Sequence, residues 1–226
     1  MKIYFIRHGQ PNYDLDRLTE LGHKQASAAA GRLKDYKIER IFASPNGRAL
    51  ETAQHTAELF GLDIETCEFM REINGDLNVG DPDFNDKFIW NITKKYPSFK
   101  GSESIPEWGW QETPAFVNSG LPEEHRVVVD GADGWLEELG YKREGDYYRV
   151  VGNDTDKTVA MFSHAGSSSV VIAHILGIPF LRFGAHFDVH LASVSCVEFS
   201  NCTGELICPQ LTLFNDSRHI EEIKIQ

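Results

Sequence analysis

The sequence contains little cysteine and no long apolar segment. Only four of its 226 residues are cysteine, and their spacing fits neither a C-x-x-C site nor a disulfide-dense scaffold. We therefore expect reduced thiols, as in a cytoplasmic protein, at Cys67, Cys196, Cys202 and Cys208. No apolar run approaches the ~18 to 20 residues of a membrane-spanning helix. The N-terminus lacks the basic and apolar regions of a signal peptide, so we expect a cytoplasmic protein with no membrane contact.

Basic residues are also few. Lys and Arg number 22 against 34 Asp and Glu, which gives a formal net charge of -12. That balance argues against nucleic acid or an anionic membrane as a partner, because phosphate backbones attract basic faces. A small anionic substrate remains compatible with the charge if the few cations converge in one pocket. The 25% of charged and 41% of apolar residues are ordinary for a globular protein with a sizeable core.

The first ten residues carry the strongest local signal. An apolar strand over 2–6 runs directly into Arg7, His8 and Gly9. Sites in α/β proteins lie at the carboxyl ends of such strands. Arginine offers a planar donor fork suited to phosphate, histidine can act as a nucleophile near neutral pH, and glycine allows close approach of the backbone. A chance tripeptide in a loop is the alternative that this stretch leaves open.

Strands and helices alternate along most of the chain. We expect Thr19 to be the N-cap of a helix that ends near residue 35, and a β-hairpin over 141–151. Further strands are predicted over 40–44, 63–69, 158–163, 195–199 and 210–214, and further helices over 48–60, 122–139 and 167–177. This order predicts a single domain over 1–226, a three-layer α/β/α sandwich with a mostly parallel sheet of about six strands.

The pattern breaks down between residues 73 and 120. This stretch holds four of the nine prolines and three of the four tryptophans, and short helices are plausible over 83–95 and 104–116. So long an irregular segment in a compact domain usually serves as a lid or a binding loop. We therefore expect a cap insertion over the carboxyl ends of the strands.

Two further elements carry a polar candidate residue at one terminus. The strand over 158–163 leads into His164, so two strand-end histidines could meet at one edge of the sheet. Arg48 falls in the first turn of its helix, where a cation opposes the helix dipole. A bound anion would offset that cost, whereas a solvated surface arginine is the simpler alternative.

Together these motifs resemble the histidine phosphatase superfamily, in its phosphoglycerate mutase-like, cofactor-dependent mutase branch. The residues that carry the resemblance are Arg7-His8-Gly9, Leu18-Thr19-Glu20-Leu21-Gly22, Ser44-Pro45 with Arg48-Ala49 and Thr52-Ala53, Ser163-His164-Ala165-Gly166, and the closing Leu213-Phe214-Asn215-Asp216-Ser217-Arg218-His219-Ile220. The resemblance covers both ends of the chain and is weak through the middle.

The resemblance implies a role for each matching residue. His8 would be the nucleophile that forms a phosphohistidine, Arg7 and Arg48 would clamp the phosphoryl oxygens, and His164 would stabilise the transferring group. These roles agree with the chemistry, because phosphoryl transfer needs positioning and charge stabilisation more than covalent work. Neither a metal nor a cofactor is required.

The general acid and the substrate contacts are also implied by the resemblance. Glu72 matches the position of the acid, with Asp76 in reserve. The expected substrate contacts are Gly9, Gln10, Asn12, Ala165 and Gly166. The sequence departs from the family at two points. Pro11 and Asp14 replace the usual small hydroxyl residue and asparagine, and Ala165 separates the second histidine from its glycine.

The expected function is metal-independent hydrolysis of a small phosphomonoester. A mutase needs extra cations around its pocket, whereas the insertion here is acidic and aromatic. A phosphoglycerate mutase and a non-catalytic phospho-ligand binding module are the alternatives.

His186 and His190 have a spacing that could bind zinc on a helix, but no third ligand is evident and their surroundings read as a loop. The sequence leaves open whether the chain is a monomer or a homodimer.

Overall fold

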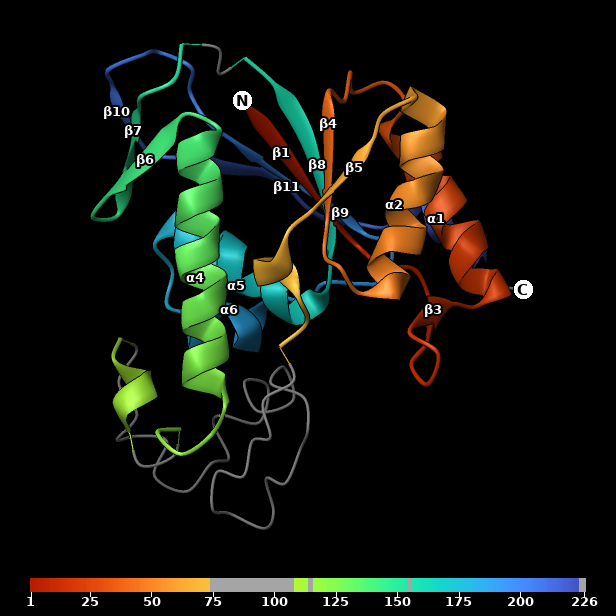
Figure 1. Ribbon diagram of the computed structural model, residues 1–226, viewed down its shortest axis with the longest axis horizontal. Coiled ribbons are helices and arrows are strands. Elements are labelled where there is room, and N and C mark those ends of the chain that lie inside the picture. The colour runs from red at the N-terminus through yellow and green to blue at the C-terminus, as the bar shows by residue number, and fades with distance from the viewer. Residues whose placement is uncertain (74–107, 114–115, 154–155, 224–226) are drawn as a thin grey trace.

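The computed structural model describes residues 1–73, 108–113, 116–153 and 156–223. Within them lies a six-stranded sheet in the order β11-β9-β1-β8-β4-β5 (Figure 1). Its strands are β1 (Lys2–Arg7), β4 (Arg40–Ala43), β5 (Ile64–Thr66), β8 (Thr158–Ser163), β9 (Val194–Glu198) and β11 (Gln210–Asp216). The four strands β1, β8, β4 and β5 are parallel, and β9 runs antiparallel between β1 and β11. The predicted mostly parallel sheet is confirmed.

Helices cover both faces of this sheet (Figure 1). One face carries α1 (Glu20–Leu33) and α2 (Gly47–Phe60), and the other carries α4 (Leu121–Glu138), α5 (Ala165–Leu176) and α6 (Phe180–His186). Neighbouring residues of β1 point to opposite faces, so Ile6 joins the apolar core under α1 and α2 while Phe5 joins the core under α4 and α5. The three-layer sandwich expected from the sequence is confirmed.

Local sequence signals set several element boundaries. The Thr19 hydroxyl accepts a hydrogen bond from the backbone N–H of Gly22 at 3.0 Å, which caps α1 as predicted. The predicted hairpin forms from β6 (Tyr141–Glu144) and β7 (Tyr147–Val150), and Gly145 takes a positive φ of 63° in its turn. A third strand, β10 (Leu206–Ile207), pairs with β7 and was not expected from the sequence.

Other predicted elements need correction. The strand expected over 63–69 is only β5, after which the chain turns into the 3₁₀ helix η1 (Glu68–Met70). Met70 is fully buried, so packing of this side chain draws the segment away from the sheet edge. The polar stretch after β1, which the sequence predicts as a loop over 10–17, forms a small hairpin of β2 (Pro11–Asn12) and β3 (Arg17–Leu18).

Most of the predicted insertion lies outside the described residues. That applies to Asp76, to the helix expected over 83–95 and to the cap itself. Of the helix expected over 104–116, the described part holds only the 3₁₀ helix η5 (Trp110–Glu112). Trp110 and Phe116 are buried and pack edge to face, with Trp110 also against His125 of α4 and Phe180 of α6. These residues therefore belong to the core.

The four cysteines carry free thiols, as their spacing predicts. Cys67 and Cys196 are buried, whereas Cys202 and Cys208 are exposed. None of the helices in the described ranges combines the length and apolar character needed to cross a bilayer.

Candidate active site

The two strand-end histidines meet at one edge of the sheet. β1 and β8 are adjacent and parallel, with Arg7 in register with Ser163, so His8 and His164 leave the sheet side by side. Their ring centroids are 5.1 Å apart in an edge-to-face arrangement. Both side chains are almost fully buried, at 1% and 0% exposure. The convergence predicted from the sequence is thus present.

The His8 ring has a defined tautomer. Its Nδ1 lies 2.7 Å from the carbonyl oxygen of Gly9, which can only accept, so Nδ1 carries the proton. Its Nε2 faces Nε of Arg48 at 3.3 Å and accepts from it. Burial lowers the pKa of His8 to about 3, and the charges of Arg7 and Arg48 act in the same direction. At neutral pH the ring is therefore neutral, and the lone pair on Nε2 can attack phosphorus once the hydrogen bond from Arg48 is exchanged for a contact with the phosphoryl group.

Arg48 is buried beside His8, so the alternative of a solvated surface arginine is wrong. It is only 7% exposed, and its guanidinium pairs with the carboxylate of Asp16. The same carboxylate accepts from the backbone N–H of Gly47 at 2.7 Å, the first residue of α2. The helix N-terminus therefore does hold an anion beside Arg48, and that anion is a side chain of this protein.

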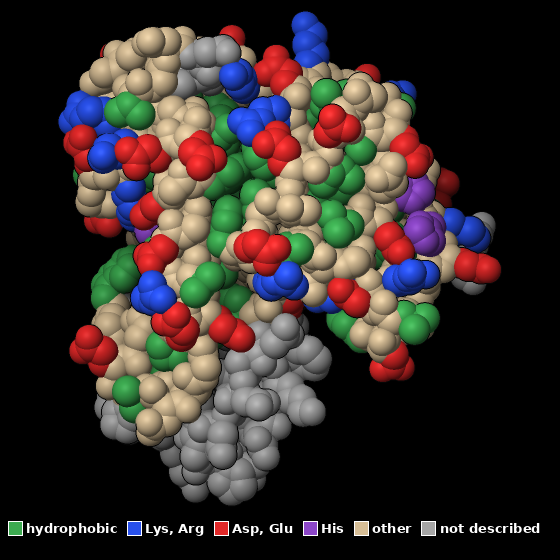
Figure 2. All heavy atoms as spheres, viewed as in Figure 1, with side chains coloured by type: hydrophobic (Ala, Val, Ile, Leu, Met, Phe, Trp, Pro, Cys, Tyr) green, Lys and Arg blue, Asp and Glu red, His purple; other side chains and the backbone are tan. Residues whose placement is uncertain are grey.

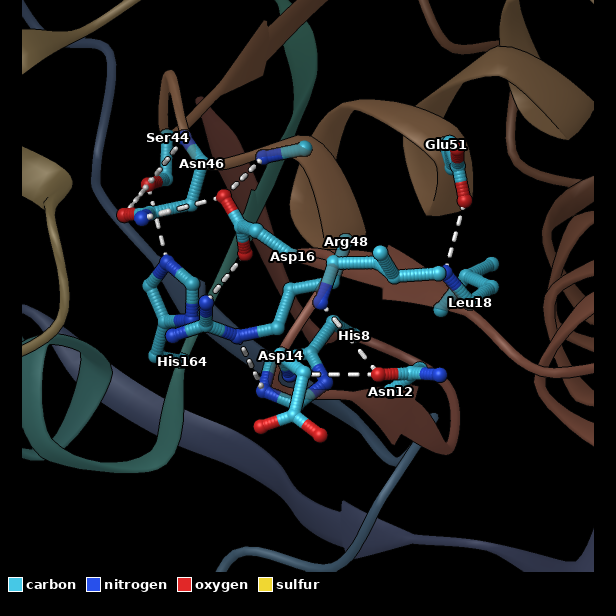
Figure 3. Close-up of polar contacts among 12 residues, drawn as sticks. His8, Asn12, Asp14, Asp16, Leu18, Ser44, Asn46, Arg48, Glu51 and His164 are labelled. Atoms are coloured by element: carbon cyan, nitrogen blue, oxygen red, sulfur yellow. Dashed lines mark hydrogen bonds and ion pairs between the residues drawn. The ribbon is translucent and has the colours of Figure 1, made fainter.

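Asp16 was not predicted as a site residue. It lies in an irregular polar stretch and reaches a residue 32 positions away, so no local pattern marks it. Ser44 and Asn46, which directly precede α2, also make hydrogen bonds at the site. Figure 3 shows the contacts that link His164 to Arg48 through Ser44, Asn46 and Asp16.

Two buried polar atoms at the site have no hydrogen-bond partner within the described residues. His164 uses Nε2 to contact the Ser44 hydroxyl at 2.8 Å, and its Nδ1 remains unpaired. Arg7 donates from Nη1 to the carbonyl oxygen of Val189 at 2.6 Å, and its Nε remains unpaired. Since unpaired buried polar groups are costly, both atoms are candidates for contact with a phosphoryl group.

The Glu72 side chain lies at the N-terminus of α5, the helix that begins directly after His164. Its Oε1 accepts from the backbone N–H groups of Gly166 at 3.1 Å and Ser167 at 3.3 Å. Burial raises the pKa of Glu72 to about 7, against the opposing effects of Arg7, Arg48 and the backbone donors. The carboxyl group can therefore hold or release a proton near neutral pH, as a general acid must.

Gly9 and Gln10 serve the local fold. The backbone N–H of Gly9 donates to the hydroxyl of Thr52 at 3.1 Å. A Cβ at Gly9 would lie 2.5 Å from the carbonyl oxygen of Gly22, so this position requires glycine. The Gln10 side chain accepts from the hydroxyl of Thr19 at 2.9 Å. Substrate contacts of both residues remain predictions.

The other predicted substrate contacts are similarly occupied. Asn12 is exposed, and its side-chain oxygen accepts from two backbone N–H groups of the turn that follows it. Ala165 begins α5, and the N–H of Gly166 holds Glu72. In the structure, Asn12 thus shapes the turn between β2 and β3, and Gly166 holds the carboxyl group of Glu72.

Comparison with known proteins settles the family. The family model of the histidine phosphatase superfamily (branch 1) matches residues 3–211. The chain belongs to this superfamily. The probable phosphoglycerate mutase GpmB of Yersinia pestis (strain Pestoides F) is 32% identical over 83 residues, which is 33% of this chain and 39% of the relative. The match thus spans well under half of that curated protein.

Solved structures of histidine phosphatases share the fold. A native mycobacterial glucosyl-3-phosphoglycerate phosphatase matches with a TM-score of 0.64 and 24% identity over 95% of this chain and 98% of its own. A phosphoserine phosphatase from Entamoeba histolytica, solved with phosphoserine, matches with a TM-score of 0.63 and 22% identity over 97% and 98%.

A pocket of about 340 Å³ adjoins the candidate site between η1 and α4. It shares Glu72 and Asn46 with the site. Its other lining residues are Glu68, Phe69, Arg71, Ile73, Glu123, Glu124, Val127 and Val128. Figure 2 shows acidic side chains along α4 on this face. The pocket lining therefore combines apolar groups with four carboxyl groups and a single cation.

The two spaced histidines form no metal cluster. His186 ends α6 and is not in a loop as expected, whereas His190 follows that helix. In the described ranges, no three His, Cys, Asp or Glu side chains come together in an arrangement that could hold a metal ion.

Proposed function

We propose that this histidine phosphatase superfamily member hydrolyses a small phosphomonoester through a phosphohistidine on His8, without a metal. The observation that carries the proposal is the neutral His8 ring, whose Nε2 faces Arg48 in a buried pocket beside His164. This arrangement supports the proposal, because phosphoryl transfer requires a nucleophile beside groups that stabilise charge, and His8 lies next to a cation and a second imidazole.

The reaction would proceed in two in-line steps. Nε2 of His8 attacks phosphorus, the bond from phosphorus to the substrate oxygen breaks, and the leaving alkoxide takes the proton of Glu72. Water then attacks the phosphohistidine, its proton passes to the Glu72 carboxylate, and the phosphorus–nitrogen bond breaks to release inorganic phosphate. Arg7, Arg48 and His164 would stabilise the charge on the transferring oxygens in both steps.

The adjoining pocket favours hydrolysis over mutase chemistry. A mutase must hold a bisphosphate, so a second anionic group would have to lie near the site. Arg71 is the one cation that lines the described part of the pocket, and it donates from Nε to the carboxylate of Glu68 at 2.9 Å. The remaining carboxyl groups would repel a second phosphate. The apolar side chains instead suit a small organic leaving group.

Phosphoglycerate mutase activity is the second candidate, because the curated relatives bear that name. It would require cations that the described part of the pocket does not supply. A phospho-ligand binding module without catalysis is less consistent with a neutral His8 and a Glu72 whose pKa is near 7.

The test is hydrolysis of p-nitrophenyl phosphate in EDTA by the wild type, His8→Ala and a control, His23→Ala, which changes an exposed histidine on α1. We expect wild-type turnover that His8→Ala abolishes and His23→Ala retains. Isomerisation of 3-phosphoglycerate with added 2,3-bisphosphoglycerate, exceeding the rate of hydrolysis, would support the mutase. Turnover that survives in His8→Ala would refute the assignment of the nucleophile.

A further inference from the structure

Asp16 is the last residue of the turn that joins β2 to β3. Its φ of 48° is left-handed, a conformation that aspartate tolerates better than most residues. Its carbonyl oxygen packs against the backbone of Gly47, where a Cβ would come within 2.2 Å. The hairpin is therefore seated tightly on the first turn of α2, and Gly47 makes this contact possible.

One oxygen of Asp16 fixes the direction of Arg48. Oδ1 pairs with Nη1 of the guanidinium, while Nε of the same group donates to Nε2 of His8 at 3.3 Å. The guanidinium is planar and rigid, so holding Nη1 also sets where Nε points. The ion pair thus aims Arg48 at the nitrogen that is the proposed nucleophile.

The other oxygen begins a chain of contacts that reaches His164 (Figure 3). Oδ2 accepts from Nδ2 of Asn46 at 3.4 Å, and Oδ1 of Asn46 accepts from the Ser44 hydroxyl at 3.1 Å. Because that hydroxyl gives its hydrogen to Asn46, it accepts from Nε2 of His164 at 2.8 Å. Nδ1 of His164 is then unpaired within the described residues and carries no proton in the neutral ring. It can donate to a phosphoryl oxygen once the ring is protonated, which the charge of a bound phosphoryl group favours.

We propose that Asp16 is a positioning residue, which holds Arg48 against His8 and, through Asn46 and Ser44, sets the ring of His164. It acts through these groups and need not touch the substrate. The kinetic consequences of this assignment depend on the proposed phosphatase function, whereas its consequences for anion binding do not.

Two simpler roles for Asp16 would produce the same contacts but different behaviour on mutation. If Asp16 only caps α2, its loss lowers stability and leaves the site chemistry of the folded protein unchanged. If it only competes with phosphate for Arg48, its loss increases anion affinity and turnover. If Asp16 positions Arg48, loss of its negative charge lowers both anion affinity and turnover. Simple removal of a negative charge would instead be expected to raise anion affinity.

The variant Asp16→Asn separates these cases, because an amide oxygen can still accept from the N–H of Gly47 while the negative charge that pairs with Arg48 is lost. Glu51→Gln is the matched control. Glu51 anchors the same hairpin to α2 by accepting from the backbone N–H of Leu18 at 2.7 Å, and it is not among the contacts of Arg48 described above. Binding of orthovanadate, kcat and KM for p-nitrophenyl phosphate, and Tm would be measured for both variants, with kinetics well below either Tm.

We expect Asp16→Asn to lower kcat about 10- to 100-fold, as for other misplaced catalytic groups, and to weaken vanadate binding by a similar factor. Glu51→Gln should change both by less than about 3-fold. In an Arg48→Lys background the further effect of Asp16→Asn should be small, because contacting residues are not additive.

Unchanged or tighter vanadate binding by Asp16→Asn would overturn the proposal. An equal loss of vanadate affinity and kcat in Glu51→Gln would also overturn it. If the wild type binds vanadate but does not turn over any phosphomonoester, the proposed function fails alone. The vanadate affinities of the two variants then still decide the role of Asp16.

Discussion

Glu72 accepts a hydrogen bond from the backbone N–H of Gly166 at 3.1 Å, two residues beyond His164. The carboxyl group and the second histidine are therefore fixed by the same turn into α5. Because burial raises the pKa of Glu72 to about 7, the proposed acid titrates in the range in which activity is measured.

The first prediction concerns pH. The first step needs protonated Glu72, so kcat/KM for an alkyl phosphate should fall about tenfold per pH unit above pH 7, and His8 stays neutral throughout because its pKa is about 3. A pH profile from 5 to 9 measures this. The falling limb should be absent in Glu72→Gln, and its persistence there would assign it to another group.

The second prediction concerns the leaving group. Glu72→Gln should lower kcat for an alkyl phosphate about 10²- to 10⁴-fold, because the alkoxide must be protonated as it leaves. For p-nitrophenyl phosphate kcat should fall much less, since its leaving group is stable as an anion. Glu68→Gln, at an exposed carboxyl group of the same pocket, is the control. Equal losses on both substrates would contradict the role of a proton donor.

The third prediction concerns packing at the site. Gly9→Ala would place a Cβ 2.5 Å from a backbone oxygen of Gly22. Relief of that clash must move the end of β1 or the start of α1, so the variant should lose about 1 to 3 kcal/mol of unfolding free energy. Urea denaturation measures this change.

Gly31→Ala provides the matching control, because a Cβ at this position within α1 meets nothing within 4 Å. Replacing a helical glycine by alanine there should stabilise the protein by about 0.5 to 1 kcal/mol. If both substitutions shift the urea midpoint in the same direction, close approach at Gly9 is not the cause.

The convergence of His8 and His164 was predictable from the sequence because each follows an apolar strand, and parallel strands end at the same edge of a sheet. The burial of Arg48 was not, since a cation in the first turn of a helix is more simply interpreted as a solvated surface residue. The structure decides this through Asp16, whose contact joins residues 32 positions apart in the chain. Long-range pairing between an irregular loop and a helix terminus has no local signature.

At Asn12 and at the end of β5 the sequence predicted a feature that other contacts in the fold override. Asn12 lies between the two positions that match the family motif, Pro11 and Asp14, and was expected to contact the substrate. Its side-chain oxygen is instead used by the backbone of the β2–β3 turn, a local alternative open to every asparagine. β5 ends at Thr66, and the buried Met70 shows that tertiary packing overrode the strand pattern. Such competition depends on neighbours that sequence periodicity does not reveal.

The most direct test of the account is detection of the phosphohistidine itself. Wild-type enzyme mixed with p-nitrophenyl phosphate would be quenched in alkaline denaturant, which preserves phosphohistidine, and its peptides would be examined by mass spectrometry. We predict one phosphoryl group on the peptide that contains His8, and its absence from His8→Ala. Turnover without any phosphoryl-enzyme on this peptide, or with the group on another residue, would contradict the account.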